Sequence, residues 1–162
     1  MQRTFRTTRR VEFCDTDMAG IAHFSNFFRY MEQAEHEFLR QVGKNVVLHD
    51  DRGTLGFPKL EAHCEYRHPA VLDAEMVVEL IVTSDDHKTI RYECTIYQEL
   101  DDDRPECEPS TANAIATKHG NRRLLAEGFL RVACCRFPPN EMPFPVPIPD
   151  HVLHAFETVK IN

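Results

Sequence analysis

The chain lacks tryptophan, long apolar runs and cysteine pairs with the spacing of a metal site. Its apolar runs are only a few residues long, whereas a helix that crosses a bilayer needs about 20, so we expect no membrane-spanning segment. The six cysteines show no CxxC or CxxxC spacing, and most lie in segments with a strand pattern. This arrangement indicates reduced, partly buried thiols and offers no paired ligands for zinc. We therefore expect neither a metal nor a cofactor.

An excess of positive charge is also missing. The chain has 19 Lys and Arg against 26 Asp and Glu, a net charge of −7, which argues against a general affinity for nucleic acid. Four arginines stand near the N-terminus, but no apolar segment follows them, so we expect no secretory signal and a cytoplasmic location. The length of 162 residues, without repeats or a linker, indicates that residues 1–162 form a single domain.

The strongest pattern present is that of an amphipathic helix from about Phe24 to Val42. Apolar residues recur at the i, i+3, i+4 and i+7 spacing of one helix face. They are Phe24, Phe27, Phe28, Met31, Ala34, Phe38 and Val42. Gly43 follows as a residue suited to ending a helix.

Most of the remaining pattern is that of strands, with apolar and polar residues in alternation. The predicted strands are 4–14, 60–66, 76–82, 90–96 and 123–137. In the first of them, Phe5, Val11 and Phe13 are predicted to share one side. In the second, the predicted buried side carries Leu60 and Tyr66. The third and fourth strands flank a turn-like stretch and should form a hairpin.

Two segments do not fit a strand. Residues 101–121 are acidic, contain prolines and show no pattern, which indicates an exposed loop. The proline-rich residues 138–149 should not continue a strand, and Asp150 is suited to cap a short closing helix through Phe156. The whole order predicts an α+β fold, with a mainly antiparallel five-stranded sheet around one long central helix. Since such a sheet has open edges, we expect a dimer.

The stretch before the helix carries two acids and a glycine, Asp15, Asp17 and Gly20. In the structural interpretation, the acids order the turn and Gly20 supplies a positive φ. In the functional interpretation, the helix start matters, because its N–H groups are free and its dipole end is positive. Such donors can stabilise a carbonyl oxygen that becomes negative, and Asp17 could reach the same carbonyl as nucleophile or general base.

These residues resemble the pattern of the 4-hydroxybenzoyl-CoA thioesterase family of hotdog-fold proteins. The stretch VEFCDTDMAGIAHFSNFFRYMEQAEHEFLR carries the family's Asp-x-Asp, the Gly three residues later, the Asn-aromatic pair and the helix acid. Here these are Asp15, Asp17, Gly20, Asn26-Phe27 and Glu32. The stretch YRHPAVLDAEM also resembles the family, with Pro69, Ala70 and Asp73 in the matching places. The resemblance covers about the first 100 residues.

The resemblance implies a hotdog fold and hydrolysis of a thioester at a dimer interface. It implies Asp17 as the catalytic carboxylate and the backbone N–H of Phe24 as the group that polarises the thioester carbonyl. The substrate would be carried on coenzyme A or on acyl carrier protein, and the assembly would be a homodimer or homotetramer. The family often has Tyr where this chain has Phe27, so any role for that hydroxyl is lost.

Further residues are secondary candidates. His23 could steer the substrate or a water, or be a hydrogen-bonded turn residue. Glu32 could act in catalysis or form a solvated ion pair with Arg29 and His36 on the same helix side. Four residues are candidates for contact with the substrate: Gly20, Asn26, Phe27 and Phe28. For Asn26 the structural alternative is a hydrogen bond that holds the loop.

Three other functions are compatible with this pattern. A hotdog dehydratase is suggested by His23-Phe24 and by Glu37, fourteen residues after His23, although the prolines usual there are missing. The others are a non-catalytic acyl-CoA sensor and a dimeric scaffold. The phosphates of coenzyme A need basic partners, and the sequence does not choose among the candidates. They are Arg67, Arg91, Lys118, Arg122, Arg123, Arg131 and Arg136.

Overall fold

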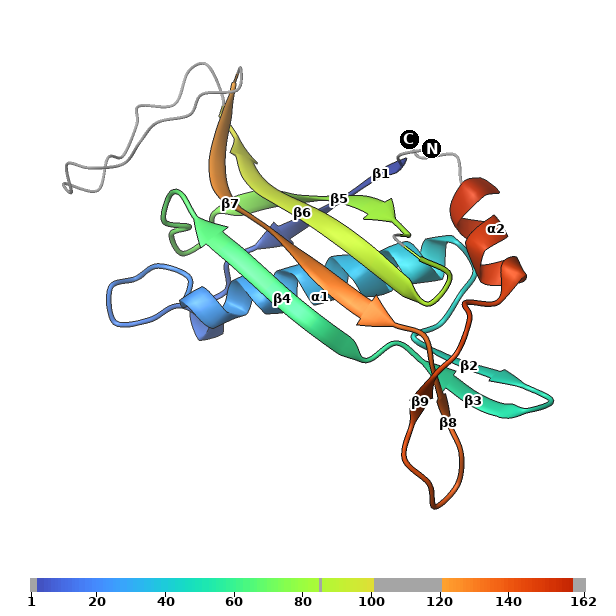
Figure 1. Cartoon of the computed structure of the whole chain (residues 1–162). Helices are drawn as coiled ribbons and strands as arrows, with labels where there is room; N and C mark the ends of the chain where they lie inside the picture. Colours follow the sequence, from blue (N-terminus) through green and yellow to red (C-terminus); the bar gives the residue numbers. More distant parts are fainter. Residues whose placement is uncertain (1–2, 85, 101–120, 159–162) are drawn as a thin grey trace.

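The computed structural model describes residues 3–84, 86–100 and 121–158. A five-stranded antiparallel sheet curves around the long helix α1 (Phe24–Gln41), as Figure 1 shows. The strands run in the order β1-β5-β6-β7-β4. They are β1 (Arg3–Arg10), β4 (Lys59–Tyr66), β5 (Glu75–Thr83), β6 (Thr89–Glu99) and β7 (Arg122–Ala133). The predicted α+β fold is confirmed, as is the hairpin between β5 and β6.

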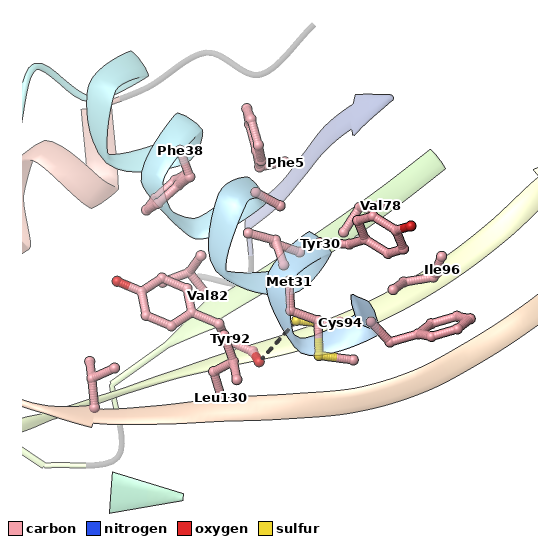
Figure 2. Close-up of a cluster of buried hydrophobic side chains, with 14 of the residues drawn as sticks. Phe5, Tyr30, Met31, Phe38, Val78, Val82, Tyr92, Cys94, Ile96 and Leu130 are labelled. Atoms are coloured by element: carbon pink, nitrogen blue, oxygen red, sulfur yellow. Dashed lines mark hydrogen bonds between the residues drawn. The ribbon is translucent and has the colours of Figure 1, made fainter. Parts of the chain in front are cut away.

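The core lies between α1 and the inner face of the sheet (Figure 2). Met31 and Phe38 point from α1 toward Val78 on β5 and Tyr92 and Ile96 on β6, and all five are buried. These strands bury every second residue, because their inner faces meet the helix on one side only. The predicted apolar faces of the central helix and of the hairpin are therefore confirmed, except for Phe24, which is 59% exposed at the start of α1.

The two ends of α1 follow from local chemistry. The helix starts at the predicted Phe24 and ends one residue before the predicted Val42, which caps it. Gly43 has a φ of +70°, and the N–H groups of Gly43 and Lys44 donate back to the carbonyls of Arg40 and Leu39. The short helix α2 (Asp150–Thr158) closes the chain, and its Phe156 packs on Phe38. The predicted closing helix is thus present.

The predicted first strand is too long. β1 ends at Arg10, and a short 3-10 helix, η1 (Phe13–Asp15), follows. A capping box holds η1: the Glu12 side chain accepts from the Asp15 N–H, and the Asp15 carboxylate accepts from the Glu12 N–H. This turn rotates Phe13 away from the sheet and leaves it 80% exposed, so its predicted place beside Phe5 and Val11 is wrong.

The predicted last strand, 123–137, is divided. It ends as β7 at Ala133, and β8 (Cys135–Phe137) joins a second sheet of order β2-β3-β8-β9. The break occurs because the backbone of Cys134 bonds to Lys88 and Val146. The other strands are β2 (Val47–Asp50), β3 (Gly53–Gly56) and β9 (Phe144–Pro145). No pattern in the sequence predicts β2 and β3, and β9 lies in the proline-rich stretch that was predicted not to continue the last strand.

The strand β4 lies where predicted, but its burial differs. It is the edge strand beside β7, and Leu60 and Tyr66 are 53% and 44% exposed instead of buried. A register shift between Lys59 and Glu61 marks a β-bulge at its start. Among the residues that the structure describes, no strand lies beside the outer edge of β4.

No helix in the described ranges has the length and apolarity to span a membrane. The predicted loop over 101–121 falls, except for Asn121, outside the described residues.

Candidate active site

The two acids before α1 flank a tight turn. The Asp17 N–H donates to the Ile21 carbonyl (2.9 Å), and the Gly20 N–H donates to the Asp17 carbonyl (3.0 Å). Gly20 has a φ of +74°, so its predicted positive φ is confirmed. The Ala22 N–H donates to the Ala70 carbonyl, which ties the turn to the segment after β4. The turn is thereby held beside the start of α1.

Asp15 and Asp17 have different surroundings. The contacts of Asp15 stabilise the fold. Its carboxylate caps η1, and its carbonyl accepts from the His23 N–H and from Asn26 Nδ2, both at 2.8 Å. Asp17 is exposed, and its carboxylate accepts from the Ala19 N–H at 2.8 Å. Of the two acids, Asp17 thus has a carboxylate that faces solvent.

The start of α1 is open toward the same side. His23 is the N-cap, and its Nδ1 lies 2.8 Å from Ser25 Oγ and accepts from the Ser25 N–H. The His23 ring is exposed and packs 4.4 Å from the Phe24 ring. The Phe24 N–H belongs to the first turn of α1, whose N–H groups have no acceptor within the helix. The Ser25 and Asn26 N–H groups donate to His23, so this geometry combines the Phe24 N–H, a positive helix end and an accessible carboxylate.

The next residues of α1, Asn26 to Phe28, are buried or half-buried. Asn26 is buried, and its side chain holds the loop through the Asp15 carbonyl. Phe27 is buried and packs edge to face on Tyr30 and Tyr66, while Phe28 is half-buried against the core. Asn26 and Phe27 are thus buried within the fold, whereas Phe24 at the start of α1 is exposed.

Glu32 lies further along α1, in a different ion pair from the one predicted. Its carboxylate is half exposed and lies 3.7 Å from Lys59 Nζ, which the bulge in β4 brings to the helix. The same Nζ lies 2.7 Å from Glu35, a fully buried carboxylate that no sequence pattern had singled out. Burial, opposed by Lys59, raises the pKa of Glu35, and burial lowers the pKa of His36.

Tyr66 is a residue of the site that the sequence analysis missed. It comes from β4, and its hydroxyl donates to the Phe24 carbonyl at 3.0 Å. Burial raises its pKa to about 12, so the phenol is protonated and can donate. It brings a hydroxyl to the helix start, where Phe27 has none. A hint in the sequence was its place just before His68-Pro69, at the end of the strand that leads to the turn.

Glu37, the acid of the dehydratase alternative, faces another way. It pairs with Arg9 at 2.8 Å and accepts from the Thr7 hydroxyl, both on β1. Fourteen residues along a helix span about 21 Å, so Glu37 and His23 cannot meet within one chain. In the parts of the chain that the structure describes, no group of three or more His, Cys, Asp or Glu is placed to hold a metal ion.

Most of the basic candidates for a phosphate contact already have acidic or aromatic partners. Arg67 pairs with Glu65 and Glu127, and Arg136 pairs with Asp50. Arg91 and Arg122 lie over the rings of Phe129 and Tyr97. The remaining candidates are Arg131, which pairs with Glu61, Arg123, which also has a contact, and Lys118, which lies outside the described residues.

The chain is similar in sequence to several known proteins. The chain is 38% identical over 91 residues to a candidate esterase of Aquifex aeolicus, an alignment that covers 56% of this chain and 70% of that one. It is 30% identical over 78 residues to a 1,4-dihydroxy-2-naphthoyl-CoA hydrolase of a Synechococcus strain, covering 45% of this chain and only 52% of the relative. The match thus spans about half of that relative's length.

A comparison of structures extends over nearly the whole chain. The crystal structure of a 1,4-dihydroxy-2-naphthoyl-CoA thioesterase from Synechocystis superposes with a TM-score of 0.71 at 19% identity, covering 97% of this chain and 98% of that one. This likeness shows the hotdog fold. The family model of the thioesterase-like superfamily matches residues 11–156, from the end of β1 to α2. The chain therefore belongs to the thioesterase-like superfamily of hotdog-fold proteins.

Proposed function

We propose that the protein hydrolyses an acyl-CoA thioester to a free acid and coenzyme A at the turn before α1. The observation that carries this proposal is the exposed Asp17 carboxylate in the turn before α1, together with the Phe24 N–H, which has no acceptor within the helix. The names of relatives support the substrate class, since they hydrolyse esters of coenzyme A.

The reaction needs a base or nucleophile and a site for negative charge. Asp17 supplies the first, either by attacking the thioester carbonyl carbon or by taking a proton from the attacking water. The Phe24 N–H and the positive end of α1 stabilise the oxyanion that forms. When the intermediate collapses, the carbon–sulfur bond breaks and coenzyme A leaves as the thiolate, which takes a proton from Asp17 in the general-base route or from water in the covalent route. In the covalent route, water then hydrolyses the acyl–Asp17 anhydride.

The exposed apolar side chains around the turn are suited to contact the acyl group of the substrate or a second copy of the chain. Met18 and Phe24 lie in the turn and at the helix start, and Val71 and Leu72 lie in the segment bonded to Ile21 and Gly20. All four are exposed in the single chain. A contiguous apolar surface beside a polar reacting group is typical of a binding site or an interface.

We further propose that the working enzyme is a dimer or a dimer of dimers, formed by pairing β4 with β4 of a second copy. In the described part of the chain, the outer edge of β4 has no strand paired with it, and its Leu60 and Tyr66 are exposed. Tyr66 also contacts the start of α1, so a partner at β4 would lie next to the proposed site. The substrate would then bind where two chains meet.

Replacement of Asp17 by Asn tests the catalytic assignment. The substitution keeps the size of the side chain and its acceptor oxygen but removes the basicity. The value of kcat should fall at least about 100-fold, the lower end for loss of a general base, while KM changes less. Release of thiol from a panel of aliphatic and aromatic acyl-CoA esters, followed with a thiol-reactive dye, measures both constants.

Asp15→Asn is the matched control, since it replaces the other acid of the turn. It should lower thermal stability and leave kcat closer to the wild-type value, because the contacts of Asp15 hold the fold. A folded Asp17→Asn protein that hydrolyses its best substrate at a near-native rate would show that the assignment is wrong. Glu32 would then be the next residue to replace.

A further inference from the structure

The free edge of β4 limits how a second copy of the chain can pair with it. The Arg67 N–H, just beyond the strand, donates to the Leu125 carbonyl on β7 at 2.8 Å. Backbone groups of successive residues alternate between the two sides of a strand. Those of Tyr66, Cys64 and Ala62 therefore point to the other side, where no strand lies among the described residues. These three residues offer hydrogen bonds to a partner strand.

The side chains of β4 divide between the two faces of the sheet. Ala62 lies opposite Leu130, a core residue of β7, so the face that carries Ala62 is turned toward α1. Tyr66 is on the same face and contacts Phe24 at the proposed site. The other face carries polar and charged side chains, which are Glu61, His63, Glu65 and, just beyond the strand, Arg67. A partner strand must match both faces.

A dimer with a two-fold axis pairs β4 with its own copy in antiparallel orientation. Opposed side chains point to the same face, so the axis must lie at one residue of the strand. An axis at Glu61 or Glu65 would set that carboxylate against its own copy, and an axis at His63 would set Glu61 against the partner's Glu65. Like charges directly opposite each other are unfavourable. The axis is therefore expected at a residue of the face toward α1.

An axis at Ala62 would leave backbone groups unpaired. Tyr66 would oppose the partner's Pro58, which has no N–H to donate. The ladder would also cross the bulge between Lys59 and Glu61, where the pairing is irregular. This register would therefore lose hydrogen bonds at both ends.

An axis at Cys64 avoids these problems. Each Glu61 then opposes the partner's Arg67, and each His63 opposes the partner's Glu65, so opposite charges and hydrogen-bonding groups meet. Glu61 and Arg67 are partly exposed in the single chain, where they pair with other residues of the same sheet, and so remain accessible to a partner strand.

We propose that two copies pair through β4 with the axis at Cys64, which brings Leu60 of each copy to the acyl site of the other. This rests on the hydrolysis and the dimer proposed above. β4 ends beside the start of α1 (Figure 1), so the start of the partner's β4 meets this end. The partner's Leu60, 53% exposed in the single chain, then adds apolar surface on the side of Val71 and Leu72.

Charge reversal tests the register without any substrate. Glu61→Arg and Arg67→Glu should each raise the dimer Kd about 10-fold, because two pairs of opposite charges become pairs of like charges. An equimolar mixture of the two variants restores opposite charges, so it should form heterodimers with a Kd near the wild-type value, measured by sedimentation velocity. Glu75→Arg, the same change at an exposed residue of β5, should leave the Kd unchanged.

Each other result contradicts the register. With the axis at His63, Glu61→Arg would face the partner's Glu65 and lower the Kd. A lowered or unchanged Kd, or a mixture without heterodimers, would therefore overturn the proposal. Melting temperatures show whether the variants are folded, and Glu61→Gln and Arg67→Gln, which should each raise the Kd about 3-fold, replace a variant that is not. A wild-type monomer would instead contradict the dimer itself.

The heterodimer also tests the place of Leu60. Asp17→Asn in the Glu61→Arg chain leaves one active site, in the Arg67→Glu chain. Leu60→Ala in the Asp17→Asn chain should lower kcat/KM at the remaining site about 10-fold, as for a lost apolar contact with substrate. The same substitution in the other chain should have a much smaller effect, although the dimer has the same composition.

Equal effects of Leu60→Ala in either chain, or a larger effect in the chain that keeps Asp17, would show that Leu60 does not act across the interface. An Asp17→Asn homodimer that remains active would contradict the proposed hydrolysis and leave the measured register as it is.

Discussion

Glu35 is the residue with the most unusual surroundings in this chain, a carboxylate fully buried in the middle of α1. Lys59 Nζ lies 2.7 Å from it, at an angle outside hydrogen-bond geometry, and reaches it because the bulge in β4 turns that side chain inward. Removing either partner of such a pair alone is usually costly, because a buried charge is left without its counter-charge. The pair therefore ties the edge strand to the helix.

The buried Glu35 leads to a pH-dependence of stability. Because burial raises its pKa, the folded protein holds this proton more tightly than the unfolded chain does. The free energy of unfolding should therefore fall as the pH rises above the ordinary Glu value of 4.5. The unfolding free energy of Glu35→Gln minus that of the wild type should increase from pH 5 to pH 8, as measured by denaturant unfolding.

Glu32→Gln is the control for this experiment, since Glu32 contacts the same lysine and is half exposed. Its stability should keep the wild-type dependence on pH. If the difference in unfolding free energy between wild type and Glu35→Gln stays constant over that range, Glu35 does not hold its proton more tightly in the folded state.

Among the elements, the pair β4 and β7 has the closest approach. A Cβ added at Gly128 on β7 would overlap the His63 carbonyl oxygen and lie 2.9 Å from the Cys64 Cα, both on β4. Because these are backbone atoms, Gly128→Ala should push β4 away and destabilise the protein by about 1–3 kcal/mol, the usual cost of overpacking.

Chemical denaturation of Gly128→Ala measures this effect. Glu127→Ala, at the neighbouring position of β7, is the matched control, because its side chain makes only a partly exposed ion pair with Arg67. The control should cost about 1 kcal/mol or less. A Gly128→Ala protein as stable as the control would mean that the two strands have room to separate.

The same elements show which features of the fold could be predicted from the sequence. α1, β5 and β6 bury one regular face, so their hydrophobic period is visible in the chain. β4 has the same alternation but lies at an edge, and nothing in its residues indicates that no strand covers its outer side. The division of the last strand at Cys134 was hidden, because apolar residues continue across it and the backbone partners are distant in sequence.

The candidate site, like the fold, could be predicted from the sequence only in part. Asp17, Gly20, His23 and Phe24 follow one another along the chain, so a local motif was sufficient to predict that they lie together. Tyr66 and Lys59 reach α1 only through the pairing of β4, and no local pattern reports such a contact.

For the molecule as a whole, the open edge of β4 is the feature that predicts assembly. Wild-type protein should be at least a dimer at micromolar concentration by light scattering. Leu60→Asp places a charge on the exposed side of β4 and should raise the dimer Kd at least about 10-fold. Met142→Asp, in the hairpin between β8 and β9 and 85% exposed, should leave the Kd near the wild-type value. A stable, active monomer would contradict the predicted interface.

The contact between Tyr66 and the start of α1 has a practical consequence for enzymology. In the proposed dimer, β4 lies at the interface, and its Tyr66 contacts Phe24 at the proposed site. Dissociation of the dimer should therefore also inactivate the enzyme. The specific activity should then drop when enzyme stocks are diluted below the dimer Kd, and the initial rate should rise with the square of the protein concentration in that range. At nanomolar enzyme concentration, the apparent kcat would therefore depend on the fraction of chains in the dimer as well as on the rate of thioester cleavage.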